Sequence, residues 1–155
     1  MKGPYAVLLG LLALALGVAV ILWPQPEGKV LDLSTAIVDI EAGQELYAQS
    51  CAVCHGTNLE GQENWQSPAP DGRLPAPPHD ETGHTWHHAD SVLFNYTKLG
   101  GRAAMAQSGL DFESGMPGFG EVLTDQEIWN ILGYIKSTWP ARTQEIQAER
   151  SRAEN

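Results

Sequence analysis

Five consecutive residues constrain this chain more than any other feature: Cys51, Ala52, Val53, Cys54 and His55. Two thiols at this spacing can add to the two vinyl groups on one edge of a haem, and the following histidine is then held beneath the iron. A thioredoxin-like redox pair would need a βαβ context, and a zinc site would need a second pair of ligands. Neither pattern is present, and the adjacent histidine argues against a simple disulfide. The motif predicts one covalent haem c, with His55 as its proximal ligand.

Three methionines are candidates for the sixth iron ligand: Met1, Met105 and Met116. Met116 lies in a loop bracketed by glycine and proline, so its thioether can fold over the open face of a haem. Met105 has small, helix-forming neighbours and is better explained by packing. His/Met ligation raises the reduction potential and leaves no easy site for oxygen or peroxide, which favours electron transfer over catalysis.

An uncharged run of nineteen residues, Tyr5 to Trp23, precedes the motif. At about 1.5 Å per residue it would span roughly 28 Å, close to the hydrocarbon thickness of a bilayer. A cleaved signal peptide is the alternative, with a small-x-small site at Gly17 to Ala19. We favour a retained anchor over residues 1–23, followed by a linker over residues 24–36. Both interpretations export the rest of the chain, to the periplasmic side of a bacterial cytoplasmic membrane.

Charge is distributed unevenly: residues 27–139 contain sixteen acidic side chains against five basic ones. Phosphates would repel such a domain, so nucleic acid is not an expected partner. The acidity serves either solubility or electrostatic steering toward a partner with a basic docking face.

Periodicity and capping signals predict helices separated by long loops. Ser34 is expected to cap a helix running toward Cys51, with Ile37, Ile40, Leu46 and Tyr47 on its apolar side. Residues 56–89 are rich in proline and show no regular pattern. Asp90 is expected to cap a helix through Leu99 that ends at Gly100 and Gly101, and a glycine-rich loop follows. The capping box at Thr124 to Glu127 opens a last helix, which Pro140 stops. The remaining residues, 141–155, form a polar tail that we expect to be frayed.

Several short segments together resemble class I cytochromes c, over roughly residues 37–139 of the predicted domain 37–140. They are 43–47 (GQELY), 51–56 (CAVCHG), 115–120 (GMPGFG), 123–129 (LTDQEIW) and 134–136 (YIK). The resemblance implies an all-α fold around one haem, in which the first and last helices cross at Gly43 with Tyr47 and Tyr134 beside it. It also implies that the carbonyl of Pro77 or Pro78 accepts the Nδ1–H of the proximal histidine.

Two departures from the family follow this proline pair. His79 stands where many relatives have leucine, and residues 71–88 are long for the family. That long stretch is similar to a subgroup of membrane-anchored bacterial monohaem cytochromes. Arg73 and Trp86 lie within it, and either could donate a hydrogen bond to a haem propionate. Trp65 and Trp129 are expected to pack.

Four of the five histidines are His79, His84, His87 and His88. One interpretation is a second metal site for copper or zinc. We prefer another, in which these side chains bond to propionates and backbone and so order the loop. A histidine beside a propionate could also couple its proton to haem oxidation.

The sequence therefore predicts a membrane-anchored electron carrier with no small-molecule substrate. Its expected partners are a quinol-oxidising complex and a terminal oxidase or photosynthetic reaction centre. Three alternatives remain open: a fixed haem subunit of a larger membrane complex, an enzyme such as a peroxidase or a sulfur-oxidising component, and a metal-handling protein using the loop from His79 to His88.

Overall fold

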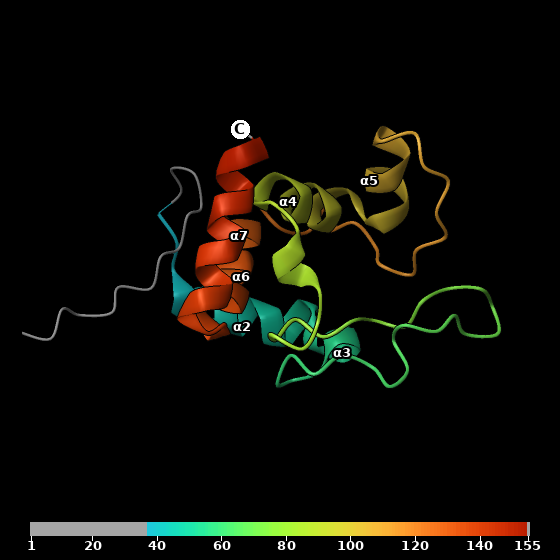
Figure 1. Cartoon of the computed structure of the whole chain (residues 1–155), viewed down its shortest axis with the longest axis horizontal. Coiled ribbons are helices and arrows are strands. Elements are labelled where there is room, and N and C mark those ends of the chain that lie inside the picture. The colour runs from blue at the N-terminus through green and yellow to red at the C-terminus, as the bar shows by residue number, and fades with distance from the viewer. Residues whose placement is uncertain (1–36, 155) are drawn as a thin grey trace, which may run out of the picture.

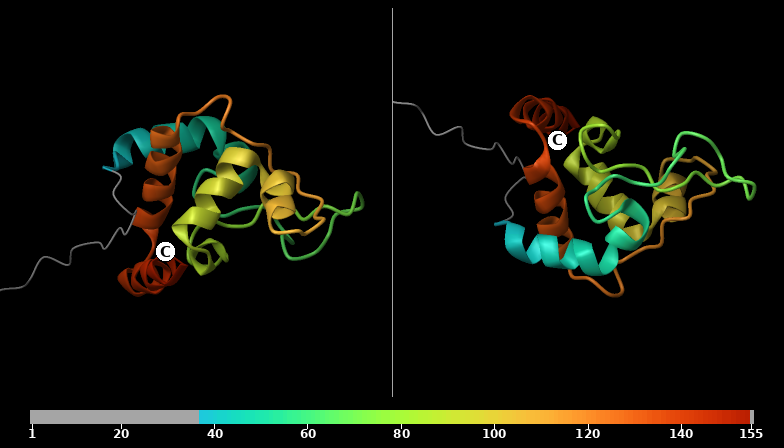
Figure 2. Two further views of the ribbon diagram at one scale, coloured as in Figure 1. Left: turned by 90° about the horizontal axis from the view of Figure 1, so that it is seen from above. Right: turned by 90° about the horizontal axis from the view of Figure 1, so that it is seen from below.

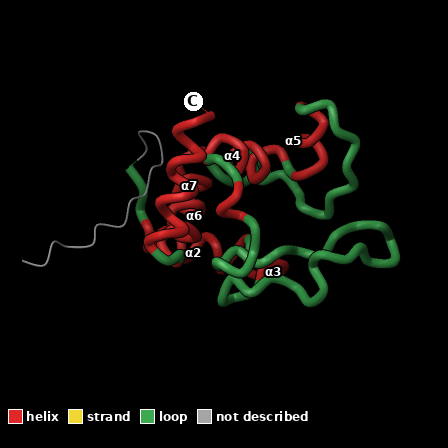
Figure 3. The backbone as a smooth tube through the Cα atoms, viewed as in Figure 1, coloured by secondary structure: helices red, strands yellow, loops and turns green. Residues whose placement is uncertain are grey.

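The computed structural model describes residues 37–154, and every regular element in that range is a helix (Figure 3). The elements in chain order are α2 (Ile40–Ser50), α3 (Ala52–His55), the 3-10 helix η1 (Thr85–His87), α4 (Asp90–Leu99), α5 (Gly101–Gln107), α6 (Asp125–Thr138) and α7 (Ala141–Glu154) (Figure 1). The all-α prediction is confirmed for these residues. Among them, no helix has the length and apolar character needed to cross a bilayer. The predicted anchor and linker lie outside the described residues.

The centre of the fold is the close crossing of α2 and α6. A Cβ at Gly43 would overlap the carbonyl oxygen of Asn130 and lie 3.1 Å from the Cβ of Tyr134. Tyr47 packs beside this point, with its ring centroid 5.5 Å from that of Tyr134. Ile131 on α6 completes a buried cluster with Tyr47. The crossing expected at Gly43 is therefore confirmed, and it fixes the helix that leads into the Cys51 motif.

The first helix begins later than the sequence predicted. Residues 37–39 are irregular, and α2 starts at Ile40 with Asp39 as its N-cap. The Asp39 carboxylate accepts a hydrogen bond from the Ala42 N–H at 3.0 Å. The prediction of a helix capped at Ser34, a residue outside the described range, is wrong at this end. Aspartate is as good an N-cap as serine. Asp39 is also tied to α6, because its N–H donates a hydrogen bond to Asn130 Oδ1.

The long segment after the motif is irregular, as its prolines predicted, apart from the single turn of η1. It lies along the lower side of the molecule in Figure 1, beneath and to the right of α3. Gly61 adopts φ +69°, and a Cβ there would lie 2.6 Å from the Pro77 carbonyl carbon. This glycine therefore lets the start of the loop approach the proline pair closely.

The helix predicted from Asp90 to Leu99 is present, although Ala89 is the N-cap and Asp90 is the first helical residue. The expected loop after Gly100 is partly wrong, because α5 begins directly at Gly101. Gly100, at φ +83°, turns the chain between the two helices. Helix α6 begins at the predicted capping box, with both reciprocal Thr124 and Glu127 bonds present. It ends at Thr138, two residues before Pro140.

Residues 141–154 form α7, so the expectation of a frayed tail is wrong. This helix lies against η1, and both views of Figure 2 show it across one end of α6 and close to the start of α4. Its buried face is polar or small, and consists of Gln144, Gln147, Ala148 and Ser151. Gln147 Nε2 donates to the His88 carbonyl and to Asp90 Oδ1, at 3.1 and 2.8 Å. Hydrogen bonds therefore dock this helix where an apolar stripe usually would.

Candidate functional site: the Cys51–His55 turn and the Met116 loop

The two cysteines and the histidine occupy one tight turn that continues from α2. Backbone bonds link the Cys51 N–H to the Tyr47 carbonyl at 2.8 Å and the His55 N–H to the Cys51 carbonyl at 3.0 Å. The Tyr47 hydroxyl closes the far end by donating to the Gly56 carbonyl at 3.0 Å. Both thiols are free, and Cys54 is exposed. The turn therefore presents two thiols and one imidazole from a rigid base.

Burial sets the protonation of these groups. Desolvation raises the pKa of the Cys51 thiol to about 11, with a smaller contribution from Cys54. Desolvation also lowers the pKa of His55, against the opposing effect of its hydrogen bond to Pro77. A neutral imidazole is the form that ligates iron, so burial favours the state that the site requires.

The proximal orientation is set by one hydrogen bond. His55 Nδ1 lies 2.9 Å from the carbonyl oxygen of Pro77. A carbonyl can only accept, so Nδ1 carries the proton and Nε2 keeps its lone pair. Of the two prolines that the resemblance offered, Pro77 is the one whose carbonyl faces His55. Pro78 instead lies beside Thr85, whose hydroxyl is 3.4 Å from the Pro78 carbonyl.

Met116 lies in a loop that is anchored to the end of α4. Its carbonyl accepts from the Gly101 N–H at 3.1 Å, and the Phe119 N–H donates to the Thr97 carbonyl at 3.0 Å. The Met116 N–H donates to Ser114 Oγ at 3.1 Å, and that hydroxyl lies 3.2 Å from the Tyr96 hydroxyl. Helix α4 thus holds the loop by backbone and side-chain bonds.

The Met116 side chain lines a cavity of about 400 Å³ formed with the end of α4 and with α5. Leu99, Ala103 and Ala106 give it apolar walls. Met105 is on α5 and does not line the cavity, in keeping with its interpretation as packing. No residue of the Cys51–His55 turn lines this cavity. The free thiols, the neutral imidazole with an available Nε2 and the thioether of Met116 are nevertheless the donor types that a covalently attached haem requires. The residues present fit that group.

The cytochrome c family model matches residues 40–139, which is well over half of the chain. The chain belongs to the cytochrome c family. This cytochrome c accordingly carries covalent haem c on its Cys51–His55 motif and transfers electrons, and it is not an enzyme. Comparison with curated proteins and with solved structures gave no match.

Of the two residues predicted to surround the haem, Trp86 has partners within the protein and Arg73 is exposed. The indole N–H of Trp86 donates to the Glu81 carbonyl at 3.3 Å, and its ring stacks on His87 with centroids 3.7 Å apart. Arg73 is exposed, and its Cδ would lie 3.9 Å from a Cβ placed on Gly115. This brings the loop after the motif up to the Met116 loop. The propionate contacts of both residues remain predictions.

Each of the remaining histidines contacts another ring, and His84 and His88 contact each other edge to face with centroids 5.4 Å apart. His84 stacks on Trp65 with centroids 5.4 Å apart, and His55 stacks on His79 with centroids 3.9 Å apart. Within residues 37–154, no group of three or more His, Cys, Asp or Glu side chains is arranged to hold a metal ion. Trp129 packs as expected, stacked on Phe94 at 4.5 Å.

Sequence reasoning missed the residues that hold the two predicted axial ligands, His55 and Met116, in place. Ser114 and Tyr96 support Met116, and the only signal for them was a serine two residues before the methionine. His79 departs from the family pattern, but its contact with His55 has no local sequence signal.

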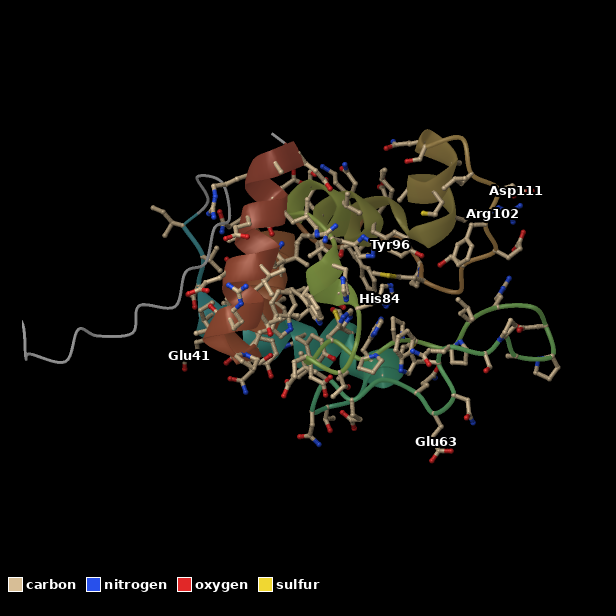
Figure 4. All side chains as sticks on the ribbon, in the orientation of Figure 1. Glu41, Glu63, His84, Tyr96, Arg102 and Asp111 are labelled. Atoms are coloured by element: carbon tan, nitrogen blue, oxygen red, sulfur yellow. The ribbon has the colours of Figure 1, made fainter. Side chains whose placement is uncertain are left out.

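The acidic side chains are spread around the molecule. Glu41, Glu63 and Asp111, for example, lie at three separate edges (Figure 4).

Proposed function

We propose that this cytochrome c is a membrane-anchored monohaem carrier that exchanges single electrons between respiratory or photosynthetic membrane complexes. In this proposal the haem domain faces the bacterial periplasm. A quinol-oxidising complex is the donor, and a terminal oxidase or photosynthetic reaction centre is the acceptor. When bound, the haem supplies an iron that alternates between the ferric and ferrous states. The chain's own residues supply attachment at Cys51 and Cys54 and axial ligands at His55 and Met116.

The observation that carries this proposal is the pair of supported axial side chains. Pro77 holds His55 at one nitrogen, and a loop bonded to α4 holds Met116 beside the cavity. Two protein ligands leave no open coordination position for a substrate, which suits outer-sphere electron transfer. The exposed Cys54 lies at the attachment edge, where a partner can approach.

The anchor is argued from residues 1–23 alone. Nineteen uncharged residues are long enough to span a bilayer, and one helix would confine the domain to diffusion in two dimensions. Intact mass of the protein extracted from membranes tests this directly, because it reports haem attachment and retention of residues 1–23 together. A mass equal to the full chain plus one haem is expected. A mass that starts after residue 19 would instead establish signal-peptide cleavage.

A fixed subunit of a larger complex is the second candidate. The segment between the predicted anchor and the domain, residues 24–36, is short and contains two prolines, which favours a nearby partner over long reach. Mild detergent extraction followed by size-exclusion chromatography separates the two. A free carrier is expected to elute as a small species at moderate salt, whereas co-elution with a large assembly that persists in salt would favour the subunit.

Electron transfer itself can be followed with purified membranes. Reduction of the haem by a quinol, and its reoxidation by oxygen or light, should both require the membrane complexes. Reoxidation by oxygen in their absence, at a comparable rate, would contradict a carrier with two protein ligands.

A further inference from the structure

The imidazole of His79, a half-buried residue, lies against the ring of His55, and electron transfer as proposed gives it no role. Its ring centroid lies 3.9 Å from that of His55, and the two planes differ by 21°. Rings this close and this nearly parallel are in face-to-face contact, so His79 covers one face of the His55 imidazole.

The His79 residue is itself held at three polar points from three different segments. Its N–H donates to the Leu59 carbonyl at 2.8 Å, and its carbonyl accepts from the indole N–H of Trp139 at 2.7 Å. Its ring nitrogen Nδ1 lies 2.9 Å from the hydroxyl of Thr85, a buried residue. The backbone and the ring rotation of His79 are therefore both fixed.

The hydrogen bond from His55 to Pro77 restrains the ligand at only one atom. It fixes the direction in which Nδ1 points but leaves the imidazole plane able to rock about that bond. A flat surface stacked on the ring face removes this freedom, and a ring held by its own hydrogen bond does so better than a flexible aliphatic chain. The Thr85 hydroxyl also donates to the Pro78 carbonyl at 3.4 Å. Thr85 is therefore bonded both to the His79 ring and to the residue that follows Pro77.

We propose that His79 is a positioning residue that fixes the plane of the His55 imidazole, with Thr85 holding the His79 ring in register. This rests on the proposed role of His55 as an axial ligand. Groups outside the coordination sphere commonly orient the ligating histidine and tune the metal in this way. The feature particular to this chain is that a second imidazole does so by stacking.

Proton NMR of the ferric, haem-loaded full chain tests the proposal. The order and spread of the four haem methyl shifts report the orientation of the axial ligand planes, and a residue with only a structural role would not move them. His79→Leu removes the stacking ring, and Thr85→Val removes its hydrogen bond at nearly constant shape. Both are expected to change the order or the spread, whereas Thr85→Ser keeps the hydroxyl and is expected to restore the parent pattern.

Ile128→Val is the matched control, because it trims a fully buried side chain on α6 that is not part of the buried cluster around Tyr47 and Trp139. It should lower stability and leave the methyl pattern unchanged. If His79→Leu does not fold, the comparison of Thr85→Val with Thr85→Ser decides alone. A parent-like pattern in His79→Leu, or in Thr85→Val where only that variant folds, overturns the proposal.

Failure of the underlying assignment would look different. If His55 is not an axial ligand, His55→Ala will leave the low-spin absorption spectrum of the parent unchanged, and the proposed axial pair fails with it. If His55→Ala abolishes that spectrum while the variants above keep the parent methyl pattern, only the role of His79 is overturned.

The sulfur-to-iron charge-transfer band should persist in His79→Leu. Its persistence would show that a changed haem methyl pattern arises on the His55 side of the haem and not on the Met116 side.

Discussion

The absence of a side chain at Gly43 allows the backbones of α2 and α6 to touch. Gly43→Ala would push a Cβ into the Asn130 carbonyl oxygen, an atom fixed within α6. We expect a loss of about 1–3 kcal/mol in the free energy of unfolding, even though alanine favours helix formation. Chemical denaturation measures it. Gly115→Ala is the control, since its Cβ would meet only Arg73 Cδ at 3.9 Å, and an equal loss there would contradict the explanation.

Two lysine–aspartate pairs with the same 2.7 Å separation give a second prediction at the scale of residues. Lys136 and Asp90 are buried, with side chains 1% and 8% exposed, whereas Lys98 and Asp125 are 36% and 60% exposed. Lys136→Met leaves a buried carboxylate unpaired and should cost about 3–5 kcal/mol. Lys98→Met should cost less than about 1 kcal/mol.

The contrast is measured by urea unfolding of both variants, and Asp90→Asn in the Lys136→Met background should recover part of the loss. Similar costs for the two lysines would mean that burial does not govern these pairs. The Lys136 pair was not predictable from sequence, because 46 residues separate its members and nothing local marks either one.

Among the elements, those with strong local signals were predictable and those defined by tertiary contact were not. The capping box at Thr124 specified α6, and the run from Asp90 to Gly100 specified α4. Helix α7 was missed because its inward face is glutamine, alanine and serine, a pattern that normally faces water. Its stability comes from partners on α4 and η1, about 60 residues earlier in the chain.

Removal of α7 by a stop after Pro140 tests how much this helix contributes. It would remove the Gln144 bond to the Trp139 carbonyl at 2.7 Å and the Gln147 and Ser151 bonds to Asp90, at 2.8 and 3.0 Å. Lost hydrogen bonds of this kind contribute about 1 kcal/mol each, so a loss of several kcal/mol is expected in thermal or urea unfolding. The Soret and visible bands should be unchanged while the domain is folded. Unaltered stability would show that α7 is only loosely attached.

For the whole molecule, the histidine loop should make stability depend on pH. Burial, followed by the neighbouring histidines, lowers the pKa of both His84 and His88 from the ordinary value of 6.5. Because the unfolded chain takes up protons first, the stabilisation is complete above pH 6.5 and is lost as the pH falls below it. The double variant His84→Gln, His88→Gln should flatten the slope of unfolding free energy against pH below pH 6.5. An unchanged slope would contradict this assignment.

The covalent motif and the methionine loop were predictable because each depends on a short run of sequence, and the resemblance to class I cytochromes c implied the crossing of α2 and α6. The contacts that hold the two proposed axial ligands were not predictable, because Tyr96 and Ser114, or His79 and Thr85, meet only when loops fold against helices. The proposed axial pair of His55 and Met116 therefore depends both on local sequence signals and on tertiary contacts.

The absorption spectrum of the ferric protein tests this pair most directly. The sulfur-to-iron charge-transfer band should be present in the parent, lost in Met116→Ala and retained in Met105→Ala, since Met105 does not line the cavity. An unchanged band in Met116→Ala would contradict the account.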